Sequence, residues 1–156
     1  MTQPKSVLNV ADLAVRSGSG YPPPCNESVK GRTAVALGNP FDLTQFGVNI
    51  ISLEPGSWAS QRHWHVHEDE LAYALEGEMI LVDEFGRHEF RAGQCAGFKA
   101  NNGNGHHIIN ESDKPAKFLI VGTRSETEVC NYSDVDMKYG RVNGKPRFTK
   151  KDGSSY

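Results

Sequence analysis

Residues 62–70 read RHWHVHEDE, and they determine how the rest of the chain is interpreted. Half of the chain's six histidines stand here at every second position, as His63, His65 and His67. On a β-strand, residues two apart project to the same face, so this spacing directs the imidazoles toward one point. A carboxylate that heads the next strand can return to that point, and Glu70 is suitably placed. The stretch therefore predicts a strand that carries one side of a metal site.

A further ligand should come from a strand farther along the chain. The sequence GNGHHIIN offers His106 or His107, and the neighbouring glycines leave space beside them. Neutral imidazoles with one carboxylate form a borderline donor set that leaves positions open for water or substrate. We therefore expect one divalent transition metal ion as cofactor, namely Zn, Fe, Mn or Ni, while Co or Cu would also suit such a set.

Length and composition indicate one globular domain. The 156 residues are 37% hydrophobic, which is enough for one core and too little for two ordinary domains. The formal net charge of -2 provides no broad basic face, so we expect no nucleic-acid partner. The sequence contains neither a signal-peptide-like start nor an apolar run long enough to cross a bilayer. We therefore expect a cytoplasmic protein without a membrane partner.

Short apolar runs alternate with turn residues along most of the chain, and helical periodicity is nearly absent. This pattern predicts an all-β sandwich or barrel at 31–124. An irregular N-terminal arm, 1–30, should precede it with one helical turn near 9–13, and a meandering C-terminal tail, 125–156, should follow it on or near the barrel. The expected strands are 33–37, 47–53, 57–65, 70–76, 78–83, 88–90, 94–98, 106–110 and 117–122.

Two motifs then give the chain a resemblance to the cupin superfamily. The first family motif, G(x)5HxH(x)3-4E(x)6G, resembles GSWASQRHWHVHEDELAYALEG, with one departure in the first loop, where six residues rather than five precede the first histidine. The second family motif ends in G(x)2H(x)3N and has a counterpart here, although Lys99 stands where the family usually has proline. The matching positions are Gly56, His63, His65, Glu70, Gly77, Gly103, His106 and Asn110.

The resemblance spans roughly residues 48–122 and implies a cupin double-stranded β-helix, which is a jelly-roll barrel. It also implies the ligand set of the metal site, which is His63, His65, Glu70 and His106. Strand parity then points His107 away from that site. Small cupins of this kind resemble one another in forming homodimers, and outward apolar side chains that could supply the contact are Trp64, Leu71 and Tyr73.

The function implied is that of a metal-dependent cupin acting on a small oxygen-rich metabolite as its small-molecule ligand. Strings such as EDELAYALEGE further resemble small bacterial cupins labelled sugar-phosphate isomerases. That reaction needs a base and a cation for the phosphate, and the nearest catalytic candidates are His67 and Lys99. Parity also places Gln61 inward beside His63. An Fe(II) dioxygenase and a non-catalytic cupin that binds or senses a sugar or small acid remain as alternatives.

Overall fold

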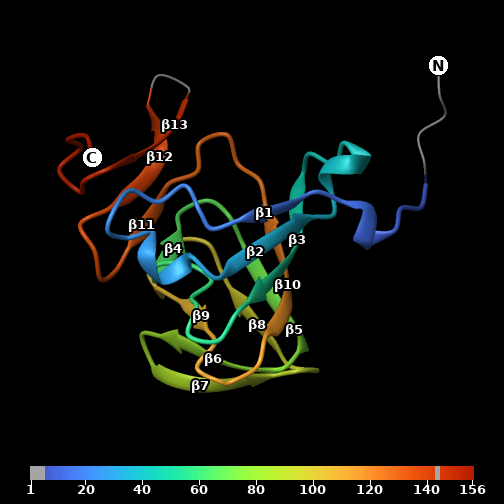
Figure 1. Ribbon diagram of the computed structural model, residues 1–156. Helices are drawn as coiled ribbons and strands as arrows, with labels where there is room; N and C mark the ends of the chain where they lie inside the picture. The colour runs from blue at the N-terminus through green and yellow to red at the C-terminus, as the bar shows by residue number, and fades with distance from the viewer. Residues whose placement is uncertain (1–5, 143–144) are drawn as a thin grey trace.

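The computed structural model describes residues 6–142 and 145–156 and confirms the all-β expectation (Figure 1). Its helical segments are one-turn 3-10 helices at Val10–Asp12, Glu27–Val29 and Asn39–Phe41. No helix in the described ranges is long and apolar enough to span a membrane. The strands are β1 (Val15–Ser17), β2 (Arg32–Ala36), β3 (Phe46–Leu53), β4 (His63–His65), β5 (Glu70–Glu76), β6 (Glu78–Asp83), β7 (Gly86–Arg91), β8 (Cys95–Phe98), β9 (His107–Ile109), β10 (Ala116–Thr123), β11 (Cys130–Tyr132), β12 (Lys138–Val142) and β13 (Lys145–Thr149).

The strands pair antiparallel in three sheets. The longest has six strands in the order β1-β2-β3-β10-β5-β8, another has β13-β12-β11-β4, and the smallest has β7-β6-β9. In Figure 1 the β6–β7 hairpin lies at the end of the barrel away from β12 and β13. The connections thus cross between sheets in the manner of a jelly roll, and each sheet turns one face toward a common interior.

The core explains the alternation of residues along the strands. On β5 the side chains of Ala72 and Ala74 are fully buried, whereas those of Leu71 and Tyr73, which alternate with them, are exposed. Ala74 is paired with Phe118 of the neighbouring strand β10 in the same sheet, and both side chains are buried in the core. The period of two therefore places one face of β5 in the core and the other on the surface.

The turn after β5 depends on Gly77, the last glycine of the first motif. Its φ of 81° is a left-handed conformation that side-chain-bearing residues rarely adopt. A Cβ atom at this position would lie 2.9 Å from the Cβ of Ala116 on the neighbouring strand β10. Glycine is required both by the backbone conformation and by the close approach of β10.

The segment expected to form a strand at 57–65 is shorter in the structure, where only β4 at its end is a strand. The expected inward position of Gln61 also differs, because its Nε2 donates to the carbonyl of Cys25 and to Ser28 Oγ. Trp58 forms a bridge with Ile109 and His63 with His106, so the pairing with the second histidine segment shifts by two residues between them. Sequence alternation before His63 therefore does not correspond to a regular strand.

The two ends of the chain contain strands that the sequence did not indicate. At the N-terminal end β1 adds to the edge of β2, and in the C-terminal tail β11 pairs with β4 while β12 and β13 continue that sheet. β11 is placed by β4, which is distant in sequence, and β1 by β2, and local alternation does not reveal such pairings. β12 and β13 pair with each other across a short connection. The division of the chain into an arm, a barrel and a tail at residues 30 and 124 stays a prediction.

Candidate metal centre

A cavity of about 610 Å³ opens into the barrel, a size typical of small-molecule sites. Its walls come from the long sheet on one side and from β4 and β11 on the other. Apolar side chains such as Ile51, Phe118 and Ile120 form part of the wall. The titratable side chains that line it are Arg16, Tyr21, Arg32, His63, His65, Glu68, Glu70, His106, His107, Glu128, Cys130, Tyr132 and Tyr139.

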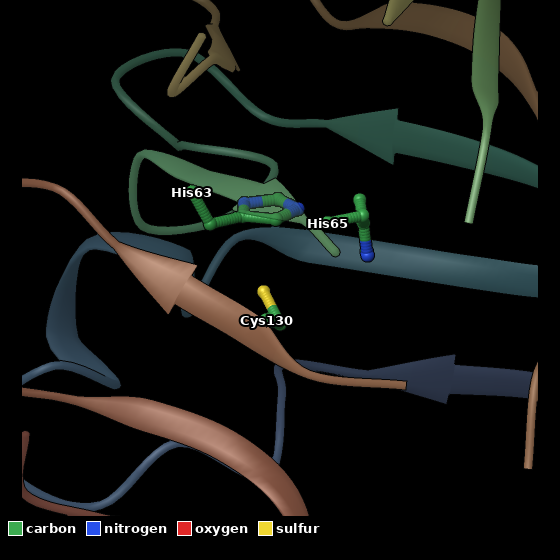
Figure 2. Close-up of side chains that lie close together, drawn as sticks. All are labelled: His63, His65 and Cys130. Carbon is green, nitrogen blue, oxygen red and sulfur yellow. The ribbon is translucent and has the colours of Figure 1, made fainter. Parts of the chain in front are cut away.

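The backbone brings the two histidine segments together. His63 and His65 share one face of β4, with their ring centroids 5.0 Å apart (Figure 2). The backbones of His63 and His106 exchange two hydrogen bonds, of 2.9 and 3.1 Å, so His106 lies directly beside β4. Glu70 begins β5 and completes the group from the opposite sheet.

The donor atoms of these residues converge. Glu70 Oε2 lies 2.9 Å from His106 Nε2, and Glu70 Oε1 lies 3.9 Å from His65 Nε2. One donor atom each from His63, Glu70 and His106 can be chosen so that all lie within 4.8 Å of one another. The ring of Phe98 stacks on that of His106 with a centroid distance of 3.4 Å, which fixes the orientation of the imidazole. The residues could therefore hold a metal ion.

The second nitrogen of each imidazole is held from outside the cluster. The Nδ1 atoms of His63 and His106 lie 2.8 and 3.1 Å from the carbonyl oxygens of Gln61 and Asn104, and His65 Nδ1 lies 3.1 Å from Glu128 Oε1. A neutral imidazole that donates through Nδ1 has its lone pair on Nε2. This is the arrangement that orients metal-binding histidines in proteins.

Imidazoles that donate through Nδ1 leave the Nε2 lone pairs available to bind a cation. His106 has an acceptor beside each ring nitrogen, Asn104 O at 3.1 Å from Nδ1 and Glu70 Oε2 at 2.9 Å from Nε2, and a neutral imidazole donates to only one of them. When Nε2–H donates to Glu70 the pair forms a hydrogen bond, and when Nδ1–H donates to Asn104 the Nε2 lone pair and the carboxylate face each other as two acceptors. A positive ion between them satisfies both. The neutral imidazoles and the carboxylate are also the donor types that divalent transition metals accept.

The pKa values favour the same protonation state. Burial lowers the pKa of His63 to about 3, and the neighbouring His106 lowers it as well. Burial alone would raise the pKa of Glu70, but its contact with His106 and the other two imidazoles outweighs this and brings the pKa to about 2. At neutral pH the His63 imidazole is therefore neutral and Glu70 is ionised, which are the forms that bind a metal.

The sequence reading missed Glu128, which the C-terminal tail inserts beside β4. The carboxylate is buried, accepts a hydrogen bond from His65 Nδ1, and also accepts from the backbone N–H groups of Val66 and His67 at 3.2 and 3.0 Å. The backbone N–H of Val66 also donates to the carbonyl of Val129. With the three contacts of Glu128, four hydrogen bonds join the tail to the end of β4. The carboxylate holds both the imidazole of His65 and the turn that follows it.

Cys130 is a second residue that the sequence reading missed. It lies opposite His65 in the β4–β11 ladder, and Figure 2 shows its sulfur directed toward the two histidines of β4. Burial raises the pKa of this thiol well above its usual value. Glu128, Cys130 and Tyr132 alternate along the chain and all line the cavity, but an alternation of this length does not by itself indicate a strand.

The catalytic candidates from the sequence lie outside this group. His67 follows the end of β4 and is exposed, and Lys99 is exposed after β8, so neither lines the cavity. His107 is buried, with its ring 4.7 Å from that of Trp58. The four expected ligands are brought together, whereas the two expected catalytic side chains are not.

Comparisons with known proteins match the chain to a family and to solved structures. The family model described as Cupin domain matches residues 49–122. A solved structure from Silicibacter pomeroyi, described as a sugar phosphate isomerase from a cupin superfamily, is 43% identical, covers 96% of both chains and has a TM-score of 0.92. A structure from Acidithiobacillus ferrooxidans, described as a candidate sugar phosphate isomerase, is 25% identical over 82% of this chain and 83% of the other, with a TM-score of 0.71.

A likeness in fold alone extends further. The polyketide cyclase RemF from Streptomyces resistomycificus is 19% identical over 76% of this chain and 79% of its own, with a TM-score of 0.61. No curated protein matches the chain. The motifs, the jelly-roll topology and the 43% identical relative agree, and the chain belongs to the cupin superfamily.

Proposed function

We propose that this cupin is a metal-dependent enzyme that acts on a small oxygen-rich metabolite, and that its specific reaction is the isomerisation of a sugar phosphate. The observation that carries the proposal is the convergence of His63, Glu70 and His106, whose donor atoms lie within 4.8 Å inside a cavity of about 610 Å³. The description of the Silicibacter pomeroyi relative supports the choice of reaction.

In this proposal His63, His65, Glu70 and His106 hold one divalent transition metal ion, which is Zn, Fe, Mn or Ni. When bound, the ion supplies Lewis-acid polarisation of a substrate oxygen. The chain's own contribution is orientation: the acceptors at Gln61, Asn104 and Glu128 keep the imidazoles turned inward. The barrel also surrounds the reacting end of the substrate and limits its access to water.

An isomerisation also needs a group that moves a proton, and Glu68 is placed for this role. It lines the cavity two residues before Glu70, and its Oε1 accepts the backbone N–H of Ser125 at 2.7 Å. Its other oxygen, Oε2, lies 4.0 Å from His65 Nδ1 and accepts no hydrogen bond in the described part of the chain. We assign Glu68 as the base, while His67 and Lys99 remain predictions from the sequence without support from their positions.

The test combines metal content with turnover. Untagged protein should contain close to one metal ion per chain, and a His63→Ala, His106→Ala double variant should contain none. The metal-loaded protein should interconvert an aldose phosphate and its ketose isomer. In Glu68→Gln the kcat should fall by about 100-fold or more, as expected for loss of a general base, while metal content stays unchanged.

The control is Glu126→Gln, which changes an exposed carboxylate of the C-terminal tail and should leave kcat unchanged. Tight binding of a sugar or small acid without turnover would reject the enzyme and support a non-catalytic cupin that binds or senses the ligand. Iron with consumption of oxygen would instead favour the dioxygenase, and no metal after reloading would overturn the proposal.

We further propose a homodimer. The outer face of β5 exposes Leu71, Tyr73 and Leu75, whose exposed fractions are 45%, 41% and 43%. An apolar row of this kind on a sheet favours contact with another protein surface. Light scattering should give twice the mass of the 156-residue chain, and a Leu71→Glu, Tyr73→Glu variant should give the monomer. A monomeric wild-type protein would contradict the proposal.

A further inference from the structure

The cavity contains a pair of arginines that the metal centre does not use. Arg16 of β1 lies opposite Ala34 of β2, and Arg32 lies two residues away from Ala34 on the same strand. Residues two apart on a strand share a face, and the burial of Ala34 identifies that face as the inner one. Both arginines line the cavity that contains the metal centre. The N-terminal arm thus places a second guanidinium beside the first.

Neither arginine has an acidic partner among the side chains that the structure describes, since the ion pairs found there involve other residues. Arg32 donates through Nη1 to the carbonyl of Gly18 at 3.0 Å. Its Nε is buried and has no hydrogen-bond acceptor within the described residues. Two cations and a buried free donor on one wall provide a site for an anion.

The electrostatics of Arg32 point the same way. Burial lowers its pKa, and the positive charge of Arg16 lowers it further, although Tyr21 acts in the opposite direction. The guanidinium remains charged at neutral pH, because even a substantial shift leaves an arginine protonated. A bound anion would therefore relieve both the desolvation of Arg32 and its repulsion by Arg16.

Aromatic rings connect this wall to the metal centre. The ring centroid of Tyr132 lies 5.7 Å from that of His63 and 5.6 Å from that of Tyr21. Tyr21 is in turn a charge neighbour of Arg32. The cavity therefore has an imidazole and carboxylate region and an arginine region, with two tyrosines packed edge to face between them. A ligand that contacts both regions must carry an oxygen-bearing end and an anionic end.

We propose that Arg16 and Arg32 bind the phosphoryl group of a phosphorylated sugar whose carbonyl or hydroxyl end lies at the metal centre. The part of this inference that concerns the sugar end rests on the proposed function. The part that concerns the phosphoryl group rests only on the arginine pair, because guanidinium groups match the geometry of phosphate oxygens. The N-terminal arm thus selects phosphorylated over neutral sugars.

The experiment compares matched ligands and matched variants by calorimetric titration of metal-free protein. The probes are inorganic phosphate, glucose 6-phosphate, glucose and malonate, and the variants are Arg16→Gln, Arg32→Gln and Arg32→Lys. Arg147→Gln is the control, because Arg147 is exposed on β13 while its neighbour Phe148 lines the cavity. Circular dichroism verifies the fold, and Arg16, exposed on an edge strand, can be changed even if the Arg32 variants fail to fold.

The wild-type protein and Arg147→Gln should bind glucose 6-phosphate at least about tenfold more tightly than glucose, and both arginine-to-glutamine variants should lose this preference. Arg32→Lys should keep part of it. The proposal is overturned if wild-type protein does not bind phosphate, if Arg16→Gln binds it unchanged, or if malonate binds more tightly than phosphate.

The two proposals can fail separately. Arginine-dependent phosphate binding in a protein that never takes up metal would support the anion site and reject the proposed enzyme. Stoichiometric metal with arginine-independent phosphate binding would reject the anion site and leave the metal centre in place.

Discussion

The barrel and the two flanking segments contribute different parts of the same cavity. The barrel strands and their loops provide the converging donors His63, His65, Glu70 and His106, whereas the flanking segments provide side chains that surround these donors, including Arg16, Glu128, Cys130 and Tyr132. The Glu70 carboxylate lies 2.9 Å from His106 Nε2 and 3.9 Å from His65 Nε2. The expected ligands thus all lie in the barrel, whereas their orientation is shared, because Gln61 and Asn104 of the barrel hold His63 and His106 and Glu128 of the tail holds His65. The hold on His65 can therefore be disturbed without removing a donor.

Loss of a barrel donor should have the largest effect. His106→Ala removes an imidazole that lies 2.9 Å from Glu70, and we expect metal affinity to fall by at least on the order of 100-fold, since each ligand carries several kcal/mol of the binding free energy. Competition with a chromophoric chelator measures the affinity. His88→Ala removes an exposed histidine of β7 and should leave the affinity unchanged. Equal affinities in wild type and His106→Ala would show that the metal, if bound, lies elsewhere.

Loss of the orienting carboxylate should have a smaller effect. Glu128→Gln keeps the size of the side chain but weakens its hold on His65 Nδ1, so metal affinity should fall by roughly 10–100-fold. The same titration measures it, and the absorption spectrum of a cobalt-substituted sample should change because the imidazole is less well oriented. Glu126→Gln serves as the matched exposed carboxylate. An unchanged metal affinity would mean that the tail packs on the barrel without helping to orient His65.

The pH dependence of folding stability should show how much of the acid sensitivity comes from the barrel donors His63 and Glu70. His63 has a pKa of about 3 when folded and about 6.5 when unfolded, so between these values the unfolded state binds one more proton. The stability of metal-free protein should therefore fall by about 1.4 kcal/mol per pH unit as pH drops from 6.5 toward 3, and Glu70, with a folded pKa of about 2, adds to this loss below pH 4.5.

Urea unfolding at several pH values measures this slope. His63→Gln removes the titrating imidazole, so its stability should depend less on pH in the range from 6.5 to 4.5. A slope identical to that of wild type would assign the acid sensitivity to groups outside the metal centre.

The smallest effect concerns the attachment of the tail to the barrel. Arg62, next to His63, donates to Asp134 Oδ2 and Oδ1 at 2.8 and 2.7 Å and to Glu84 Oε1 at 2.7 Å. Because both partners are about half exposed, Arg62→Met should cost only about 1 kcal/mol in urea unfolding. Arg87→Met breaks only an exposed pair with Glu111 and should cost less. A larger loss in the second variant would contradict the role of Arg62.

Local patterns were sufficient for the barrel. Turn residues and a period of two predict the strands from β5 to β10 to within a few residues, and the alternation of His63 and His65 predicts that their side chains converge. The same alternation includes His67, which is exposed because β4 ends at His65. Periodicity does not show where a strand ends, so it assigned one histidine too many to the shared face.

The flanking contributions were not predictable by such patterns. Glu128 and Cys130 lie beside His65 only because β11 pairs with β4, and Arg16 lies in the cavity only because β1 pairs with β2. These strands have three residues each, which is too short for a reliable alternation signal. Their positions depend on partners distant in sequence, and a single chain does not disclose such pairings.

In the proposed metal centre, Cys130 would offer a soft sulfur donor in addition to the harder carboxylate oxygen of Glu70. His63 and His65 can form a group with Cys130 as well as contribute to the centre at Glu70, so the two imidazoles have an oxygen on one side and a sulfur on the other. Manganese favours the oxygen side, whereas thiophilic ions such as zinc favour sulfur. Because burial raises the pKa of the thiol, binding through sulfur must first release its proton. Metal selectivity in this cupin should therefore change with pH, with acid favouring the harder ions.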